Sequence, residues 1–319
     1  MIKIAIAGAN GQVGSEVCLL LRGVPDIEVV PIVRNPSGSA FLRLQGFDCR
    51  YGKIADPVDA RRLIGDCDVV ADFALSTTGR PRVDRVANRT ITRNVVEAAR
   101  PSARLVFFST IMVYAPNTTL GLIPDAYGLE KMLNERLFRK LCKRLGHEAY
   151  VLRLGHVLGG LQNITRAIGD QIRSGSVTLP EGGERPSNTV FTAMIAQALV
   201  DIVRGKAAPG TFDLISYPQW TWREVYAYYA QANGITLEIV PISLQSARSP
   251  GHAVPGRLLR WMLAYMSSSQ FVRERSSFLL GLLPERINRT VHIRYLQARA
   301  LREINVLCQV KSHIVATDW

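Results

Sequence analysis

The run Gly8-Ala9-Asn10-Gly11-Gln12-Val13-Gly14 lies between the apolar stretch Ile2-Lys3-Ile4-Ala5-Ile6-Ala7 and the segment Ser15-Glu16-Val17-Cys18-Leu19-Leu20-Leu21. The apolar stretch predicts a strand, and the segment after the glycines predicts a helix. Glycines at such a turn let the backbone approach a pyrophosphate, and the helix N-terminus offers N–H groups and a favourable dipole. We therefore expect a dinucleotide-binding turn whose cofactor contacts are Gly8, Asn10, Gly11, Gln12, Val13 and Gly14.

Short apolar runs alternate with segments of helical length through the first half of the chain. The runs after the first are Val29 to Val33, Val69 to Ala74, Leu105 to Ser109 and Tyr150 to Leu154. This alternation is typical of a parallel sheet wound by crossover helices. It predicts an α/β fold, namely a Rossmann-type doubly wound parallel sheet with a smaller C-terminal α/β substrate lobe.

The expected domain boundary lies near Gly155, where the regular alternation loosens. Residues 1–155 are predicted to form the dinucleotide-binding Rossmann domain, with its sheet completed by parts of 186–215. Residues 156–319 are predicted to form the substrate lobe and an Arg-rich helical C-terminal region. Within that region, the segment from Leu258 to Leu283 is apolar but interrupted by charged residues. It could therefore form a helix packed against the protein or a helix at a membrane surface.

Composition narrows the class of protein. A chain of 319 residues with 47% hydrophobic residues can fill a sizeable core, which excludes disorder. A net charge of +13 and a pI near 9.9 favour anionic partners, although no recognised nucleic-acid motif is present and we expect no nucleic-acid partner. Five scattered cysteines indicate a reducing compartment and no metal site. A strand pattern from Ile2 and no long apolar run predict a cytoplasmic protein without an integral membrane segment.

A candidate catalytic pair follows the run Leu105 to Ser109. Tyr127 and Lys131 are four residues apart in a segment that predicts a helix, so both side chains lie on one helical face. An unperturbed phenol has a pKa near 10, and a neighbouring ammonium lowers that pKa because it stabilises the phenolate. The pair is therefore suited to proton transfer at neutral pH.

The order of these motifs, G-x-x-G-x-x-G, then Thr110 four residues before Tyr114, then Y-x-x-x-K, resembles the extended branch of the short-chain dehydrogenase/reductase superfamily over roughly residues 1 to 240. The resemblance implies that Tyr127 and Lys131 relay a proton, and that Lys131 also holds the nicotinamide ribose. It implies that Thr110 binds the substrate carbonyl, with Ser109 as the fallback. It also implies a homodimer formed through the helices around Asn88 and Tyr127. The cofactor contacts expected beyond the glycine turn include Ala74, Asn88, Tyr127 and Lys131.

Two basic residues bear on the choice of cofactor. Arg34 follows the second predicted strand, where an NAD enzyme usually has an acid for the ribose 2′-hydroxyl, and it is suited to a 2′-phosphate. Lys53 stands where the family often has an Asp that binds the adenine amine. Both could instead be solvated surface charges. The expected cofactor is NADP, with NAD as the alternative.

The residues after Thr110 bear on the reaction. Sugar 4,6-dehydratases of this branch carry an Asp-Glu pair there, whereas this chain has Ile111 and Met112, so dehydration is disfavoured. We expect an NADP(H)-dependent oxidoreductase that reduces a ketone or oxidises a secondary alcohol, with a nucleotide sugar as one candidate substrate. The first alternative is a nucleotide-sugar 4-epimerase with bound NAD, and the second is a non-catalytic NADP-binding regulator.

The expected substrate contacts come from the end of strand Tyr150 to Leu154 and from the second lobe. His156 lies in an element that resembles the family's L-R-x-x-x-V-Y-G motif. Nucleotide-sugar epimerases carry Asn at this position. His156 could contact the substrate, or it could equally be a buried structural histidine. Asn163 at the start of a predicted helix and Arg185 could contact a diphosphate, because helix N-termini and arginine both suit that anion. The expected substrate residues are Ser109, His156, Asn163 and Arg185.

Overall fold

The computed structural model describes residues 1–78, 80–114 and 126–243 of the chain. The expected Arg-rich C-terminal region, including Leu258 to Leu283, lies outside the described residues. The described strands are β1 Ile2–Ala7, β2 Ile27–Val33, β3 Arg50–Tyr51, β4 Val69–Asp72, β5 Arg104–Thr110, β6 Glu148–Leu154, β7 His156–Leu158, β8 Ser176–Pro180, β9 Thr189–Phe191, β10 Gly210–Leu214 and β11 Glu238–Ile242. The α-helices are α1 Gln12–Leu21, α2 Ala40–Leu44, α3 Pro57–Ile64, α4 Pro81–Ala98, α5 Ala126–Leu145, α6 Asn163–Ile172, α7 Thr192–Val203 and α8 Trp222–Ala232.

The main sheet has seven parallel strands in the order β10-β6-β5-β4-β1-β2-β3. The chain runs outward from β1 to β3, returns to β4 on the other side of β1, and continues outward to β6. In such sheets the crevice between the two halves, outside the carboxyl ends of the strands, is the usual ligand site. The predicted Rossmann-type fold class is confirmed.

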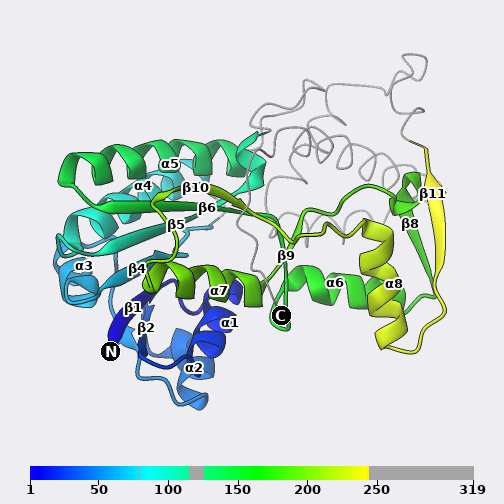
Figure 1. Cartoon of the computed structure of the whole chain (residues 1–319), viewed down its shortest axis with the longest axis horizontal. Coiled ribbons are helices and arrows are strands. Elements are labelled where there is room, and N and C mark those ends of the chain that lie inside the picture. Colours follow the sequence, from blue (N-terminus) through cyan, green and yellow to red (C-terminus); the bar gives the residue numbers. More distant parts are fainter. Residues whose placement is uncertain (79, 115–125, 244–319) are drawn as a thin grey trace.

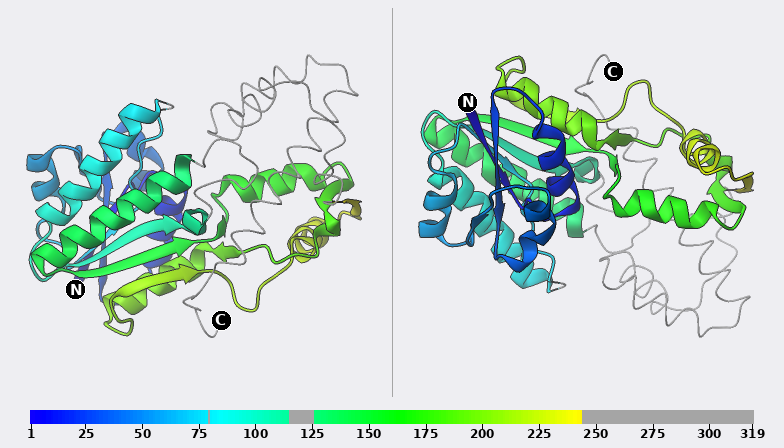
Figure 2. Two further views of the ribbon diagram at one scale, coloured as in Figure 1. Left: turned by 90° about the horizontal axis from the view of Figure 1, so that it is seen from above. Right: turned by 90° about the horizontal axis from the view of Figure 1, so that it is seen from below.

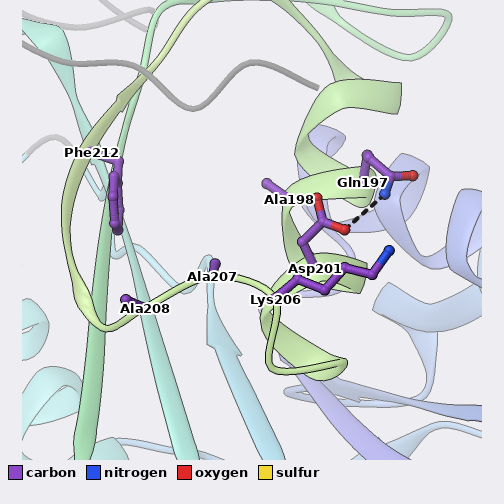
Figure 3. Close-up of a pocket in the computed structure, with 7 residues that line it drawn as sticks. All are labelled: Gln197, Ala198, Asp201, Lys206, Ala207, Ala208 and Phe212. Atoms are coloured by element: carbon purple, nitrogen blue, oxygen red, sulfur yellow. Dashed lines mark hydrogen bonds between the residues drawn. The ribbon is translucent and has the colours of Figure 1, made fainter. Parts of the chain in front are cut away.

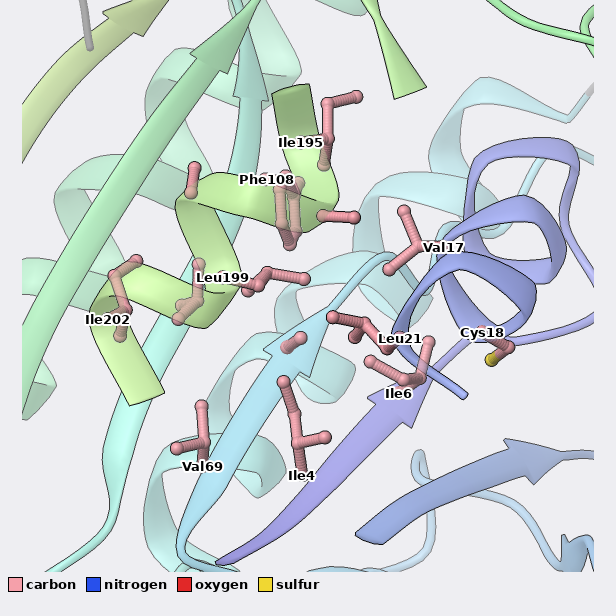
Figure 4. Close-up of a cluster of buried hydrophobic side chains, with 14 of the residues drawn as sticks. Ile4, Ile6, Val17, Cys18, Leu21, Val69, Phe108, Ile195, Leu199 and Ile202 are labelled. Atoms are coloured by element: carbon pink, nitrogen blue, oxygen red, sulfur yellow. The ribbon is translucent and has the colours of Figure 1, made fainter. Parts of the chain in front are cut away.

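Helices cover both faces of this sheet (Figure 1). In β1, Ile4 and Ile6 pack into the cluster that contains residues of α1, α2 and α7, whereas Ala5 and Ala7 pack into the cluster that contains residues of α3, α4 and α5. Figure 4 shows part of the first cluster, where β1 and α1 meet α7. Because both faces are buried, the strands are almost continuously apolar.

The smaller lobe is built from α6, α8 and two two-stranded parallel sheets, β7-β9 and β8-β11 (Figure 2). Its own core gathers around Leu158, Ile168 and Val225. Gly155 joins β6 to this lobe, and a Cβ there would lie 1.9 Å from the Asn188 carbonyl oxygen. A glycine is therefore required where the chain leaves the main sheet. The segment Gly210–Leu214 adds the last strand of the main sheet, whereas Thr189–Phe191 pairs with β7.

The strand β5 extends one residue beyond the expected run Leu105 to Ser109, so Thr110 is also part of the strand. Strands β8 and β11 were not predicted. No helix within the described residues combines the length and apolar character needed to cross a membrane.

Candidate functional site

The glycine turn brings the ends of β1 and β4 into close contact. Gly8 has a φ of +77°, and a Cβ there would lie 2.9 Å from the Cα of Ala74, the residue expected to border the cofactor. A Cβ at Gly14 would lie 2.6 Å from the Gly8 carbonyl oxygen. These glycines therefore allow a backbone turn that larger residues would displace.

The N-terminus of α1 is left open for an anion. Its N-cap is Gly11, which has no side chain to cap the helix, and no acidic residue lies in the first turn. By contrast, the Asp56 carboxylate caps α3, and a Thr221–Glu224 capping box closes α8. Unsatisfied N–H groups and the helix dipole at such a terminus suit a phosphate. The residues present thus fit a dinucleotide pyrophosphate.

Arg34 and Lys53 lie at the carboxyl ends of neighbouring strands. Arg34 directly follows β2, and the Val33 carbonyl accepts a 3.1 Å hydrogen bond from the Gly52 N–H, next to Lys53. Both side chains are exposed, and neither forms an ion pair with another described residue. Asn10 extends from the glycine turn to the loop after Arg34, where its Nδ2 lies 3.2 Å from the Cβ position of Gly38.

Two hydroxyls lie at the end of β5. Thr110 is 8% exposed, and its Oγ1 accepts a 3.2 Å hydrogen bond from the Met112 N–H, so its own proton remains available for donation. The Ser109 Oγ is buried and has no hydrogen-bond partner among the described residues. Ile111 and Met112, in the position of a dehydratase acid pair, are buried apolar residues.

Lys131 is almost completely buried, and its ammonium reaches the end of β5. Its Nζ donates a 2.8 Å hydrogen bond to the Phe108 carbonyl and lies 5.1 Å from the centre of the Phe107 ring. Burial lowers the pKa of Lys131, and the charge of Asp72 partly opposes this effect. Lys131 therefore has a carboxyl group as an electrostatic partner inside the fold.

Asp72 ends β4 directly beside Phe107 of β5 and is 2% exposed. Burial raises the pKa of Asp72 to about 6, while the Lys131 charge and the Ala74 N–H oppose the increase. Sequence patterns missed this residue, although an acid at the end of an apolar strand was a visible signal.

Tyr127 lies in the first turn of α5 and is 42% exposed, one turn before Lys131. The Asn88 amide accepts from the Ser76 N–H (2.6 Å), donates to the Ser76 carbonyl (3.2 Å) and bonds Glu130, the residue before Lys131. Asn88 is thus a buried brace between the loop after β4 and α5. Its side chain is enclosed rather than exposed on the helix surface.

A polar network of side chains connects β6, α5 and β10 near the end of β5. Arg153 of β6 forms two hydrogen bonds with Glu135 of α5 (3.0 and 2.8 Å) and one with the Tyr114 hydroxyl (2.8 Å). The Tyr114 hydroxyl also bonds the Asp213 carboxylate of β10 at 2.9 Å. Burial and then the bond to Asp213 raise the pKa of Tyr114, so its phenol holds its proton more tightly and is a poor proton donor. Tyr127 is the better candidate for proton exchange.

The N-terminal region of α6 is occupied by side chains from α1. The Gln12 Oε1 accepts a 3.2 Å hydrogen bond from the Asn163 N–H. The Glu16 carboxylate accepts from the Gly160 and Leu161 N–H groups at 2.8 and 3.1 Å. The expected diphosphate contact at Asn163 is therefore not supported, because protein groups already satisfy these donors.

The two remaining substrate candidates lie in the smaller lobe. The His156 ring is 5.3 Å from the Trp222 ring, centre to centre, and its backbone N–H bonds the Asn188 carbonyl. Arg185 pairs with Glu181 at 2.6 Å, so its guanidinium would have to leave a carboxylate in order to bind a diphosphate.

A cavity of about 470 Å³ lies between α7 and β10. Figure 3 shows Gln197 and Asp201 from α7, the connection through Lys206, and Phe212 from β10 around it. This connection enters β10 at its amino end, whereas the glycine turn and Thr110 follow the carboxyl ends of their strands. The cavity is therefore separate from the candidate active site.

The seven-stranded parallel sheet, the open N-terminus of α1 and the Tyr127–Lys131 turn are the features of a dinucleotide-binding fold with a candidate proton-transfer pair. The profile of the NAD dependent epimerase/dehydratase family matches residues 4–191, and the chain belongs to that family.

Two curated relatives share limited sequence identity with this chain. The chain is 30% identical over 131 residues to quinone oxidoreductase 2 of Escherichia coli (41% of this chain, 43% of the relative). It is 27% identical over 162 residues to UDP-2-acetamido-2,6-beta-L-arabino-hexul-4-ose reductase of Pseudomonas aeruginosa (50% of this chain, 36% of the relative). The chain thus spans less than half of the length of either relative.

The solved structure of UDP-N-acetylglucosamine 4-epimerase from Bacillus cereus superimposes with a TM-score of 0.61 at 20% identity. The match covers 76% of this chain and 86% of the epimerase. At this identity the superposition supports the fold.

Proposed function

We propose that the protein is an NADP(H)-dependent oxidoreductase that interconverts a ketone and a secondary alcohol, with a nucleotide sugar as the substrate class. The observation that carries the proposal is the placement of Lys131. Its buried ammonium bonds the Phe108 carbonyl two residues before Thr110, and Tyr127 lies one turn earlier on the same helix.

Each side chain has a distinct role in this reaction. A bound nicotinamide supplies or accepts the hydride. In the direction of reduction, the Tyr127 phenol donates a proton to the carbonyl oxygen as it becomes an alkoxide. The Lys131 ammonium stabilises the resulting phenolate, and the Thr110 hydroxyl donates a hydrogen bond to the same substrate oxygen.

The preference for NADP rests on Arg34 and Lys53. Two exposed cations at adjacent strand ends, without ion-pair partners among the described residues, favour a 2′-phosphate over a 2′-hydroxyl. The surrounding region contains Asn10 but no acid in the position where NAD enzymes usually carry one.

We infer a nucleotide sugar as the substrate class because several relatives are named for UDP-linked sugars. His156, beside Trp222 at the start of the smaller lobe, is a candidate to contact the sugar. Four described cysteines are buried and free, which fits the cytoplasmic location that we infer.

A nucleotide-sugar 4-epimerase with bound NAD is the second candidate. The buried Ile111 and Met112 favour it equally, because epimerisation, like reduction, needs no acid pair after Thr110. The two reactions differ in cofactor balance: a reductase consumes NADPH in proportion to product, whereas an epimerase returns the hydride and consumes none. Product analysis with and without added NADPH separates them.

The decisive experiment is Tyr127→Phe in the full chain, assayed by NADPH oxidation against a panel of ketones and UDP-4-keto sugars. We expect kcat to fall by about 10²–10⁴-fold with NADPH affinity retained. Thr110→Val should lower kcat similarly, whereas Ser109→Ala, the matched control at the neighbouring hydroxyl, should keep most of the activity. Full turnover by Tyr127→Phe would overturn the mechanism. NADPH binding without turnover of any substrate by the wild type would favour the non-catalytic regulator.

A further inference from the structure

The outer surface of helices α4 and α5 is strongly basic. These two helices pack against each other on one face of the main sheet (Figures 1 and 2). Their exposed cations number four on α4 and five on α5: Arg82, Arg85, Arg89, Arg93, Arg136, Arg139, Lys140, Lys143 and Arg144. We refer to this set as the α4–α5 basic face.

Acidic side chains hardly offset this charge. Asp84 and Glu135 are buried, and Glu130 is bonded to Asn88. Within these two helices, as far as the structure describes them, Glu97 is the one exposed acid, and it already pairs with Arg144 at 3.3 Å. The face thus carries a large part of the net charge of +13.

The arginines of α4 form a continuous stripe. Arg85, Arg89 and Arg93 are spaced four residues apart, so their side chains lie one above another along the helix. None of them forms a hydrogen bond or an ion pair with another described residue. Like charges at this spacing destabilise a helix slightly. The repulsion would be relieved by an anionic partner.

Exposed apolar side chains border this stripe. Val83 and Val86 of α4 are 51% and 67% exposed, on the same outer side of the helix. A helix surface that alternates arginine with exposed aliphatic side chains suits a lipid headgroup region, because the aliphatic groups enter the acyl boundary while the cations bind phosphate.

Other occupants fit this face less well. The homodimer that the family resemblance implies would form through these same two helices, and its two-fold symmetry would oppose the same patch on both copies and so bring the arginine stripes together. Nucleic acid is bound mainly through polar side chains to phosphate, with aromatic stacking on single strands, and it gains little from exposed valines.

We propose that the α4–α5 basic face docks the protein onto a membrane surface rich in anionic lipids. The nucleotide turn is at the carboxyl end of β1, and the glycines and Arg34 are not part of this face, so docking leaves the glycine turn and Arg34 free. This inference is independent of the proposed reaction.

The test is sedimentation of the full chain with vesicles of phosphatidylcholine alone, or of equal parts phosphatidylcholine and phosphatidylglycerol. We expect binding to the anionic vesicles alone, with loss at high salt. The variant Arg85→Glu/Arg89→Glu/Arg93→Glu should bind at least about 100-fold more weakly, since each basic residue near such a surface contributes substantially. Arg43→Glu/Arg204→Glu/Lys206→Glu makes the same change in net charge outside this face and should bind nearly as well as wild type.

Folding and alternative occupants are checked in parallel. NADPH affinity and the thermal unfolding temperature should be equal in both triple variants. If the α4 triple variant does not fold, the milder substitutions Arg85→Gln/Arg89→Gln/Arg93→Gln replace it. Val86→Asp should also weaken vesicle binding. Equal vesicle binding by wild type and the α4 variant would overturn the proposal. It would equally be overturned if the α4 variant lost binding to duplex DNA and not to vesicles, or if light scattering showed a wild-type dimer that the variant dissociates.

Discussion

The Thr192 hydroxyl donates a 2.8 Å hydrogen bond to the Glu16 carboxylate across 176 residues of sequence. The same carboxylate accepts from the Gln162 amide at 2.8 Å and from two backbone N–H groups of the loop before α6. Glu16 therefore joins α1, which begins at the glycine turn, to the first residue of α7 and to the smaller lobe. A single side chain thus links three segments that are far apart in the sequence.

Replacing Glu16 with Gln should destabilise this junction. An amide places an N–H group opposite donors, so at least one hydrogen bond to a charged acceptor is lost, at a cost of about 1.5–3 kcal/mol of unfolding free energy. Urea unfolding measures this cost. Glu238→Gln, an exposed acid on β11, is the control and should change stability little. An equal effect of both substitutions would mean that the junction contributes nothing specific.

Gly14→Ala should disrupt the nucleotide turn. The new Cβ would lie 2.6 Å from the Gly8 carbonyl oxygen, so α1 or the turn must shift. We expect a loss of about 1–3 kcal/mol of unfolding free energy together with weaker NADPH binding in a fluorescence titration. Gly169→Ala in α6 meets no atom within 4 Å and should instead gain up to about 1 kcal/mol from helix propensity. Unchanged NADPH affinity in Gly14→Ala would argue against the cofactor position.

Arg34→Asp should reverse the cofactor preference. The substitution removes a cation from the end of β2 and adds a carboxylate that would repel a 2′-phosphate and accept a bond from a 2′-hydroxyl. We expect NADPH affinity to fall by at least about tenfold with NADH affinity equal or improved. Arg43→Asp, at another exposed arginine, should leave both affinities unchanged. Parallel losses for both cofactors would contradict the assignment.

The buried Asp72 should make stability depend on pH in a defined direction. Its pKa rises from an ordinary 3.8 to about 6 on folding, so between these values the folded state holds more protons than the unfolded state. Stability from this group is therefore present below about pH 4 and is lost as the pH rises through about 6. A difference of about two pKa units corresponds to about 3 kcal/mol.

Urea unfolding of wild type and Asp72→Asn from pH 4 to pH 7 tests this sign. Relative to the variant, the wild type should lose up to about 3 kcal/mol as the pH increases. Asp48→Asn, at an exposed carboxylate, should show no such trend. A constant difference between wild type and Asp72→Asn across this range would refute the titration of Asp72.

Local patterns were enough to predict the main sheet and the catalytic helix. Period-two and continuous apolar runs identified β1, β4 and β5 within a few residues, because a buried parallel strand needs apolar side chains on both faces. The four-residue spacing of Tyr127 and Lys131 placed both on α5, since one helical turn brings such residues onto the same face.

Other features depended on contacts between distant segments. Arg153 lies within the apolar strand β6, and its partners Glu135 and Tyr114 lie on other elements, so local patterns did not reveal this network. The short strands β8 and β11 were missed because each has five residues, includes a proline and is stabilised by pairing with the other.

Sequence periodicity thus specified the strands of the main sheet and the helix that carries Tyr127 and Lys131, because those elements depend on neighbours two to four residues apart. The tertiary structure decided that the charges of Asp72 and Lys131 interact inside the fold, and that Glu16 and Gln12 bond the backbone N–H groups at and before the start of α6. Those outcomes depend on packing between elements far apart in the chain, where burial sets the strength of each charge and local spacing carries no information.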